Sequence, residues 1–128
     1  LAALDLFGAE RIAVLTPYVD DVNAGIARYL EDHGKSISAF SSFKIVENEI
    51  MALVTPQSIF NAALEADRND ADALFISCTA IRAVEVIDKI EQKLGKPVIT
   101  AVQAMFWQSL RLAGFKGKIS GYGQLMCL

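Results

Sequence analysis

The chain has 128 residues, a formal net charge of −3 and 53% hydrophobic residues, which is the size and composition of one domain with a sizeable core. The mild acidity without a basic stripe argues against a nucleic-acid partner, and no apolar run reaches the roughly 20 residues that span a bilayer, so we expect a cytoplasmic protein without a membrane partner. One histidine and two cysteines, Cys78 and Cys127, offer neither metal-ligand spacing nor a disulfide framework, so we expect no metal site and two reduced thiols.

The first part of the chain predicts the end of a helix, then a strand and a second helix. Leu1 to Gly8 has the pattern of the last turns of a helix that stops at a glycine. Arg11 to Leu15 is a short apolar run typical of a buried strand, and it leads into the polar turn Thr16-Pro17-Tyr18. A helix is expected from Asp20 to His33, since acidic residues suit its positive N-terminus and Gly34 follows its end.

The rest of the chain repeats this alternation. Ser36 to Phe43 alternates polar and apolar residues, which favours a strand near the edge of a sheet, and a loop with Asn48 follows. Thr55-Pro56 is a strong helix start. The later elements follow from the same signals: a strand at Ala73 to Ile76, a helix from Ile81 to Leu94, a strand at Val98 to Ala101 and a helix at Gln103 to Ala113.

This order of elements predicts an α/β fold, with a four-stranded parallel sheet and helices on both faces. Ligands in such folds bind beyond the carboxyl ends of the strands. We therefore expect the binding edge to hold the segments that follow the strands: Thr16 to Tyr18, Glu47 to Asn48, Ser77 to Thr79 and Thr100 to Gln103.

Cys78 lies where the apolar run Ala73 to Ile76 changes into a helical pattern. With a helix from Ile81, the thiol is expected beside free backbone N–H groups and the positive end of a helix dipole, which favour a thiolate or a bound carboxylate. Ser77 and Thr79 supply hydroxyls to the same turn. A buried cysteine is often only a packing residue, so both interpretations stay open at this point.

Several motifs in the same order resemble the aspartate/glutamate racemase superfamily, and most of all its arylmalonate decarboxylase, maleate cis-trans isomerase and ectoine-utilisation branch. The matching segments are Thr16-Pro-Tyr-Val-Asp-Asp-Val-Asn23, Ser77-Cys78-Thr79, Leu94-Gly-Lys-Pro-Val98, Trp107 to Gly114 and Gly121-Tyr122-Gly123. Members of this superfamily are built from two similar flavodoxin-like lobes with the active site between them. The resemblance implies that residues 1–128 form one lobe, the second, that Leu1 to Gly8 belongs to the linker helix and that an N-terminal lobe is missing.

The resemblance also implies a chemistry without cofactors. In this superfamily a cysteine acts as acid or base on a small carboxylate during racemisation, isomerisation or decarboxylation, and Cys78 takes that place here. The residues that correspond to substrate contacts are Tyr18, Asn48, Ser77, Thr79, Ala80 and Gln103. The turn before Gln103 departs from the family, because Ala101-Val102 stands where relatives carry Ser-Ser or Ser-Asn.

Other functions compete with this interpretation. A non-catalytic α/β ligand-binding or regulatory module would use Cys78 for packing alone. A carrier of flavin mononucleotide ranks last, because Asp20 and Asp21 stand where a phosphate loop would need hydroxyls. If the first lobe is absent, two copies that pair as a homodimer would bring two Cys78 thiols together.

Overall fold

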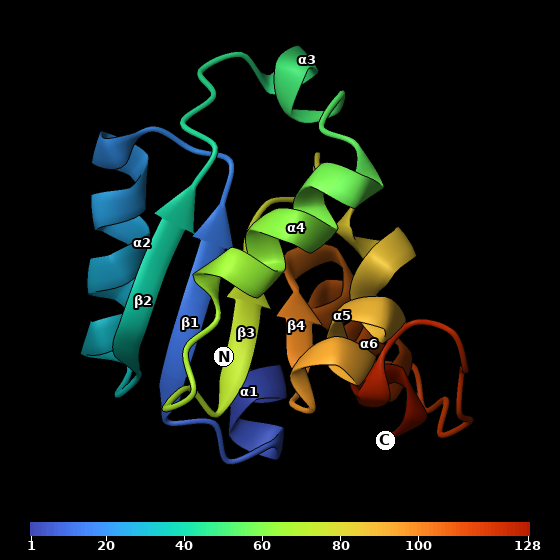
Figure 1. Cartoon of the computed structure of the whole chain (residues 1–128). Coiled ribbons are helices and arrows are strands. Elements are labelled where there is room, and N and C mark those ends of the chain that lie inside the picture. Colours follow the sequence, from blue (N-terminus) through green and yellow to red (C-terminus); the bar gives the residue numbers. More distant parts are fainter.

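The computed structural model describes residues 1–128 and confirms the four-stranded parallel sheet. The strands are β1 (Arg11–Thr16), β2 (Ser36–Ser42), β3 (Ala73–Ile76) and β4 (Val98–Thr100), and their order in the sheet is β2-β1-β3-β4. Every neighbouring pair is parallel, so all carboxyl ends meet at the upper edge in Figure 1. The edge position that alternation predicted for β2 is confirmed.

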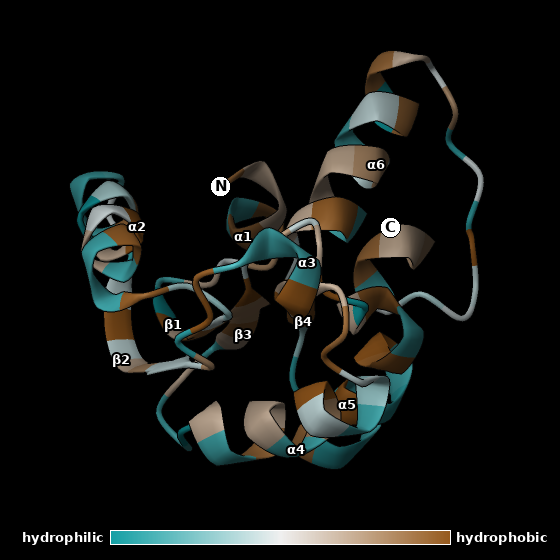
Figure 2. Cartoon of the chain, turned by 90° about the horizontal axis from the view of Figure 1, so that it is seen from above, coloured by the Kyte–Doolittle hydropathy of each residue, from teal (hydrophilic) through white to brown (hydrophobic).

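Helices cover both faces of the sheet, as Figures 1 and 2 show. Helices α4 (Pro56–Ala66) and α5 (Ile87–Leu94) close one apolar cluster against the sheet. Helices α1 (Ala2–Leu6), α2 (Asp20–Asp32) and α6 (Ala101–Leu112) pack on the other cluster. Strands β1 and β3 are buried on both faces, which explains why their sequences are continuous apolar runs instead of alternating ones.

Local signals place several helix ends correctly. The Thr55 side chain accepts a hydrogen bond from the backbone N–H of Ser58 at 3.1 Å, so it is the N-cap that its sequence predicts. Gly95 follows α5 with φ 69°, a left-handed conformation that glycine adopts without steric cost. No helix in the structure is both long and apolar enough to cross a membrane.

The helix predicted from Ile81 is wrong at its start. Residues 77–82 form an irregular segment, a short 3-10 helix η1 (Ala83–Val86) follows, and α5 begins only at Ile87. The apolar residues Ile81, Val84, Ile87 and Ile90 recur every three positions, and this spacing suits a 3-10 turn as well as an α-helix. Ile81 is 4% exposed, so it reaches the core from a loop without any helix.

Two further boundaries differ from the prediction. The expected loop at Asn48 contains a one-turn helix α3 (Asn48–Met51), which the buried Met51 anchors to the same apolar cluster as Cys78. Helix α6 starts at Ala101, before the predicted Gln103, because Thr100 and Gln103 form a capping box in which each side chain bonds the other's backbone.

Candidate active site

Cys78 stands directly beyond the carboxyl end of β3, the strand between β1 and β4. The backbone of Ser77 still donates to Leu15 O at 3.0 Å, and the chain turns sharply at the next residue. Cys78 has φ 118°, in the region that favours glycine. Such strain costs about 1 to 3 kcal/mol and is concentrated at functional sites in proteins.

The Cys78 sulfur accepts a hydrogen bond from its own turn. The thiol is 6% exposed, and its Sγ accepts the backbone N–H of Ala80 at 3.2 Å. Because α5 begins at Ile87, the predicted position of Cys78 at a helix N-terminus is wrong. The backbone donor on the sulfur is a loop N–H, which can stabilise a thiolate without a helix dipole.

Tyr18 follows β1, the neighbour of β3, and packs against the same apolar cluster as Cys78. Burial and, to a smaller extent, the nearby Cys78 thiol together raise the pKa of the Tyr18 phenol to about 12, although the Ser77 side chain acts to lower it. The phenol is therefore a neutral hydrogen-bond donor across the physiological pH range. The sheet order thus brings Tyr18, Ser77 and Cys78 together, as the sequence predicted for this edge.

The other predicted residues are placed less closely around the thiol. Thr79 is exposed on the Cys78 turn, and Asn48 is exposed at the start of α3 above the strand ends. Gln103 is buried, and its Nε2 donates to Tyr122 O at 2.5 Å while its Oε1 accepts from Thr100 N. All of its side-chain polar atoms are bonded within the chain, so its role as a substrate contact stays a prediction.

The sequence placed Thr16 at this edge, but sequence reasoning missed Asn23 and Ser42, which support Tyr18 with it. Thr16 donates to Asn23, and Thr16, Asn23 and Ser42 all bond to the Tyr18 backbone. The only signal for them in the sequence is the segment from Thr16 to Asn23, in which the asparagine is interpreted only as part of a helix start.

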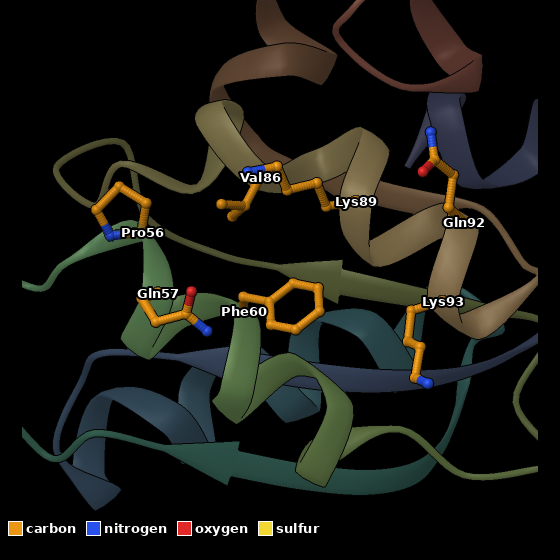
Figure 3. Close-up of a pocket in the computed structure, with 7 residues that line it drawn as sticks. All are labelled: Pro56, Gln57, Phe60, Val86, Lys89, Gln92 and Lys93. Atoms are coloured by element: carbon orange, nitrogen blue, oxygen red, sulfur yellow. The ribbon is translucent and has the colours of Figure 1, made fainter.

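Two apolar hollows reach predicted site residues. One of about 350 Å³ is lined mainly by α1 and α2 and includes Ser77 in its wall, and one of about 310 Å³ includes Gln103 and Tyr122. A third groove, shown in Figure 3, lies between α4 and α5 and contains none of the predicted site residues. The residues that line the Figure 3 groove are Pro56, Gln57, Phe60, Val86, Lys89, Gln92 and Lys93.

Comparison with known proteins identifies the family. The family model for arylmalonate decarboxylase matches residues 1–126. This chain belongs to the arylmalonate decarboxylase family. Within that family the chain is 33% identical to arylmalonate decarboxylase of Bordetella bronchiseptica, over 98% of this chain and 53% of that protein.

The similarity extends to maleate isomerases. The chain is 29% identical to maleate isomerase of Nocardia farcinica, over 98% of this chain and 49% of that protein. The structure of the Nocardia farcinica maleate cis-trans isomerase bound to TRIS matches with a TM-score of 0.94 and 25% identity, over 98% of this chain and 52% of that chain. Unliganded arylmalonate decarboxylase matches with a TM-score of 0.88 and 32% identity, over 98% and 56%. The chain therefore spans about half the length of these relatives of the arylmalonate decarboxylase family.

Proposed function

We propose that this chain is one lobe of a cofactor-independent decarboxylase or isomerase that acts on small carboxylates, with Cys78 as the thiol that transfers the proton. The observation that carries the proposal is the Cys78 turn itself: a strained, nearly buried thiol at a strand end, with the Ala80 N–H on its sulfur and the Tyr18 phenol beside it. Relatives named arylmalonate decarboxylase and maleate isomerase support the reaction class.

The chemistry of decarboxylation suits a single thiol. When a malonate-type acid loses carbon dioxide, the electron pair of the broken C–C bond stays on the α-carbon as an enediolate. The S–H proton of Cys78 is transferred to that carbon, and the Ala80 N–H stabilises the thiolate that forms. A proton from water restores the thiol.

Isomerisation of a cis double bond would use the same cysteine with a second group. A nucleophile on the opposite side of the substrate adds to one alkene carbon, and Cys78 gives its proton to the other, which leaves a C–C single bond that rotates. Cys78 then removes that proton, the bond to the nucleophile breaks, and the double bond re-forms in the trans geometry. The choice between the two reactions depends on whether a second lobe provides such a nucleophile.

The carboxylate of the substrate needs neutral donors near the thiol. We propose that the Tyr18 hydroxyl and the backbone N–H of Thr79 supply them, with the Ser77 hydroxyl at the same edge, since the Ala80 N–H donates to the Cys78 sulfur. Asn48 would contribute its amide from α3, which is exposed and free to contact a ligand.

A second lobe would complete the site. The relatives are about twice as long as this chain. We propose that residues 1–128 act as the C-terminal lobe of a two-lobe cytoplasmic enzyme and are inactive alone unless two copies pair. Light scattering at high concentration tests pairing, and a monomer under those conditions excludes the homodimer.

Selective alkylation of the two cysteines tests the role of Cys78. Cys78 is 6% exposed and Cys127 is half-buried, so exposure alone makes Cys127 the faster thiol. An activated Cys78 should instead react faster with iodoacetamide between pH 6 and 9, and a Cys78→Ser variant should lose that fast phase. The longer parent protein should then turn over maleate or an arylmalonate and lose the activity in the Cys78→Ser variant.

The opposite labelling result favours the non-catalytic module. If Cys127 reacts and Cys78 stays unmodified in the folded chain, Cys78 is a packing residue. Ligand binding should then tolerate Cys78→Ala, and no thiol-dependent turnover should occur.

A further inference from the structure

Three polar side chains from three separate elements converge on the backbone of Tyr18. Thr16 ends β1, Asn23 lies in the first turn of α2 and Ser42 ends β2. Thr16 is completely buried and Asn23 is 7% exposed. Polar groups at such positions need hydrogen bonds that replace those to water, because an unpaired buried group is costly.

The hydrogen bonds satisfy both backbone groups of Tyr18. Thr16 Oγ1 accepts the Tyr18 N–H at 3.3 Å and lies 2.5 Å from Asn23 Oδ1. Asn23 Nδ2 donates to Tyr18 O at 2.9 Å, and the Ser42 hydroxyl donates to the same oxygen. The side chains therefore replace the sheet hydrogen bonds that Tyr18 lacks beyond the end of β1.

The direction of each hydrogen bond in this network follows from its acceptors. Asn23 Oδ1 and Tyr18 O carry no proton, so the Thr16 hydroxyl must donate to the first and the Ser42 hydroxyl to the second. Turning the Asn23 amide over would place its oxygen against Tyr18 O, where two acceptors repel each other. The network thus has one favourable arrangement, and that arrangement fixes the turn.

The neighbouring backbone holds the same turn a second time. Phe43 N donates to Thr16 O at 3.0 Å, and Ile45 N donates to Pro17 O at 2.7 Å. The carbonyls of Thr16, Pro17 and Tyr18 are all bonded to the end of β2 or to the residues after it. The main chain of Tyr18 is therefore fixed, while its phenol lies near Cys78 and Ser77.

We propose that Thr16, Asn23 and Ser42 are positioning residues that hold the Tyr18 phenol in place against the Cys78 thiol. The proposal rests on the proposed function, since it assumes that this phenol and this thiol face the substrate. None of the three touches the reacting atoms. They act through Tyr18, and supporting groups of this kind keep a site within the narrow geometry that its chemistry needs.

A double-mutant cycle tests whether the network acts through Tyr18. Thr16→Val removes one hydroxyl from the network and Tyr18→Phe removes the phenol O–H, and the readout is the rate of Cys78 alkylation relative to Cys127 in the same molecule. Each single variant should slow Cys78 relative to Cys127 by about threefold or more, the size of one lost hydrogen bond. In the Tyr18→Phe background, Thr16→Val should change the ratio by less than about 1.5-fold.

Matched variants separate positioning from a loss of stability. Thr55→Val makes the same substitution at the exposed N-cap of α4, so it weakens the fold and should leave the ratio unchanged. Thr16→Ser keeps the hydroxyl and should restore the ratio. If Thr16→Val does not fold, Ser42→Ala tests the network at a less buried position, since it removes the hydrogen bond to the Tyr18 carbonyl.

Two results would overturn the proposal. One is an equal effect of Thr16→Val with and without the Tyr18 hydroxyl, and the other is an equal effect of Thr16→Val and Thr55→Val. The cycle measures labelling and not turnover. If the effects of Thr16→Val and Tyr18→Phe on labelling are coupled but the longer parent protein shows no activity, the positioning role stands and the proposed function is refuted.

Discussion

The strained backbone of Cys78 predicts that a chain with glycine at this position is more stable than one with alanine. A side chain at φ 118° costs about 1 to 3 kcal/mol, and glycine has no Cβ to strain. Glycine also adds conformational freedom to the unfolded chain, which lowers stability by about 0.5 to 1 kcal/mol. Compared with Cys78→Ala, which keeps the Cβ and also lacks the sulfur, Cys78→Gly should therefore be about 1 kcal/mol more stable.

Urea unfolding of the two variants measures this difference. A gain of about 1 kcal/mol corresponds to roughly 3 to 5 °C in melting temperature for a domain of this size. Ala80→Gly is the matched control, since Ala80 has no positive φ, and it should lose about 0.5 to 1 kcal/mol. Strain at Cys78 is refuted if Cys78→Gly is less stable than Cys78→Ala by the amount that Ala80→Gly loses relative to the wild type. The turn would then be unstrained, and strain would no longer support a functional site at Cys78.

Substitutions at three further positions test the electrostatics and the helix capping of the fold. The folded chain keeps the Tyr18 proton to about pH 12, whereas the unfolded chain releases it near pH 10.0. Between these pH values the free energy of unfolding of the wild type should therefore fall by up to about 1 kcal/mol more than that of Tyr18→Phe, measured by urea unfolding at each pH. Parallel curves for the two proteins would contradict the raised pKa. Burial raises the pKa of Glu91 although Val98 N and Gln124 N donate to its carboxylate, so its ionisation costs stability as the pH rises above 4.5. Glu91→Gln should therefore be at least as stable as the wild type at pH 7 and lose that advantage below pH 4.5. A variant that is less stable than the wild type at pH 7 would mean that the two hydrogen bonds outweigh the cost of burial. Thr100→Val should lower the stability measured by thermal unfolding by about 1 kcal/mol, because it removes the N-cap of α6. Thr100→Ser keeps the capping hydroxyl and should retain most of that stability. An equal loss of stability in both variants would argue against capping.

Local patterns in the sequence were enough for the architecture. Continuous apolar runs at Arg11 to Leu15 and Ala73 to Ile76 indicated strands buried on both faces, and the alternating Ser36 to Phe43 indicated an edge strand. These signals depend only on neighbouring residues, because a side chain's face follows from its place in a strand or helix. The same reasoning placed Cys78 beyond a strand end and Tyr18 at the same edge of the sheet.

Tertiary structure decided what surrounds the thiol. The spacing of Ile81 and its neighbours fits two kinds of helix, and only packing against the sheet leaves residues 77–82 irregular and removes the helix end from Cys78. The strain at Cys78 arises because the chain must turn within one residue after β3. No local pattern encodes that requirement.

The support beneath Tyr18 shows the same limit of the sequence. Thr16 and Ser42 are 26 residues apart, and they meet only because β1 and β2 pair in parallel with their last residues in register. The sequence by itself determined which residue types were available at the carboxyl edge. Strand pairing, which is a long-range interaction, decided which of them lie within hydrogen-bond distance.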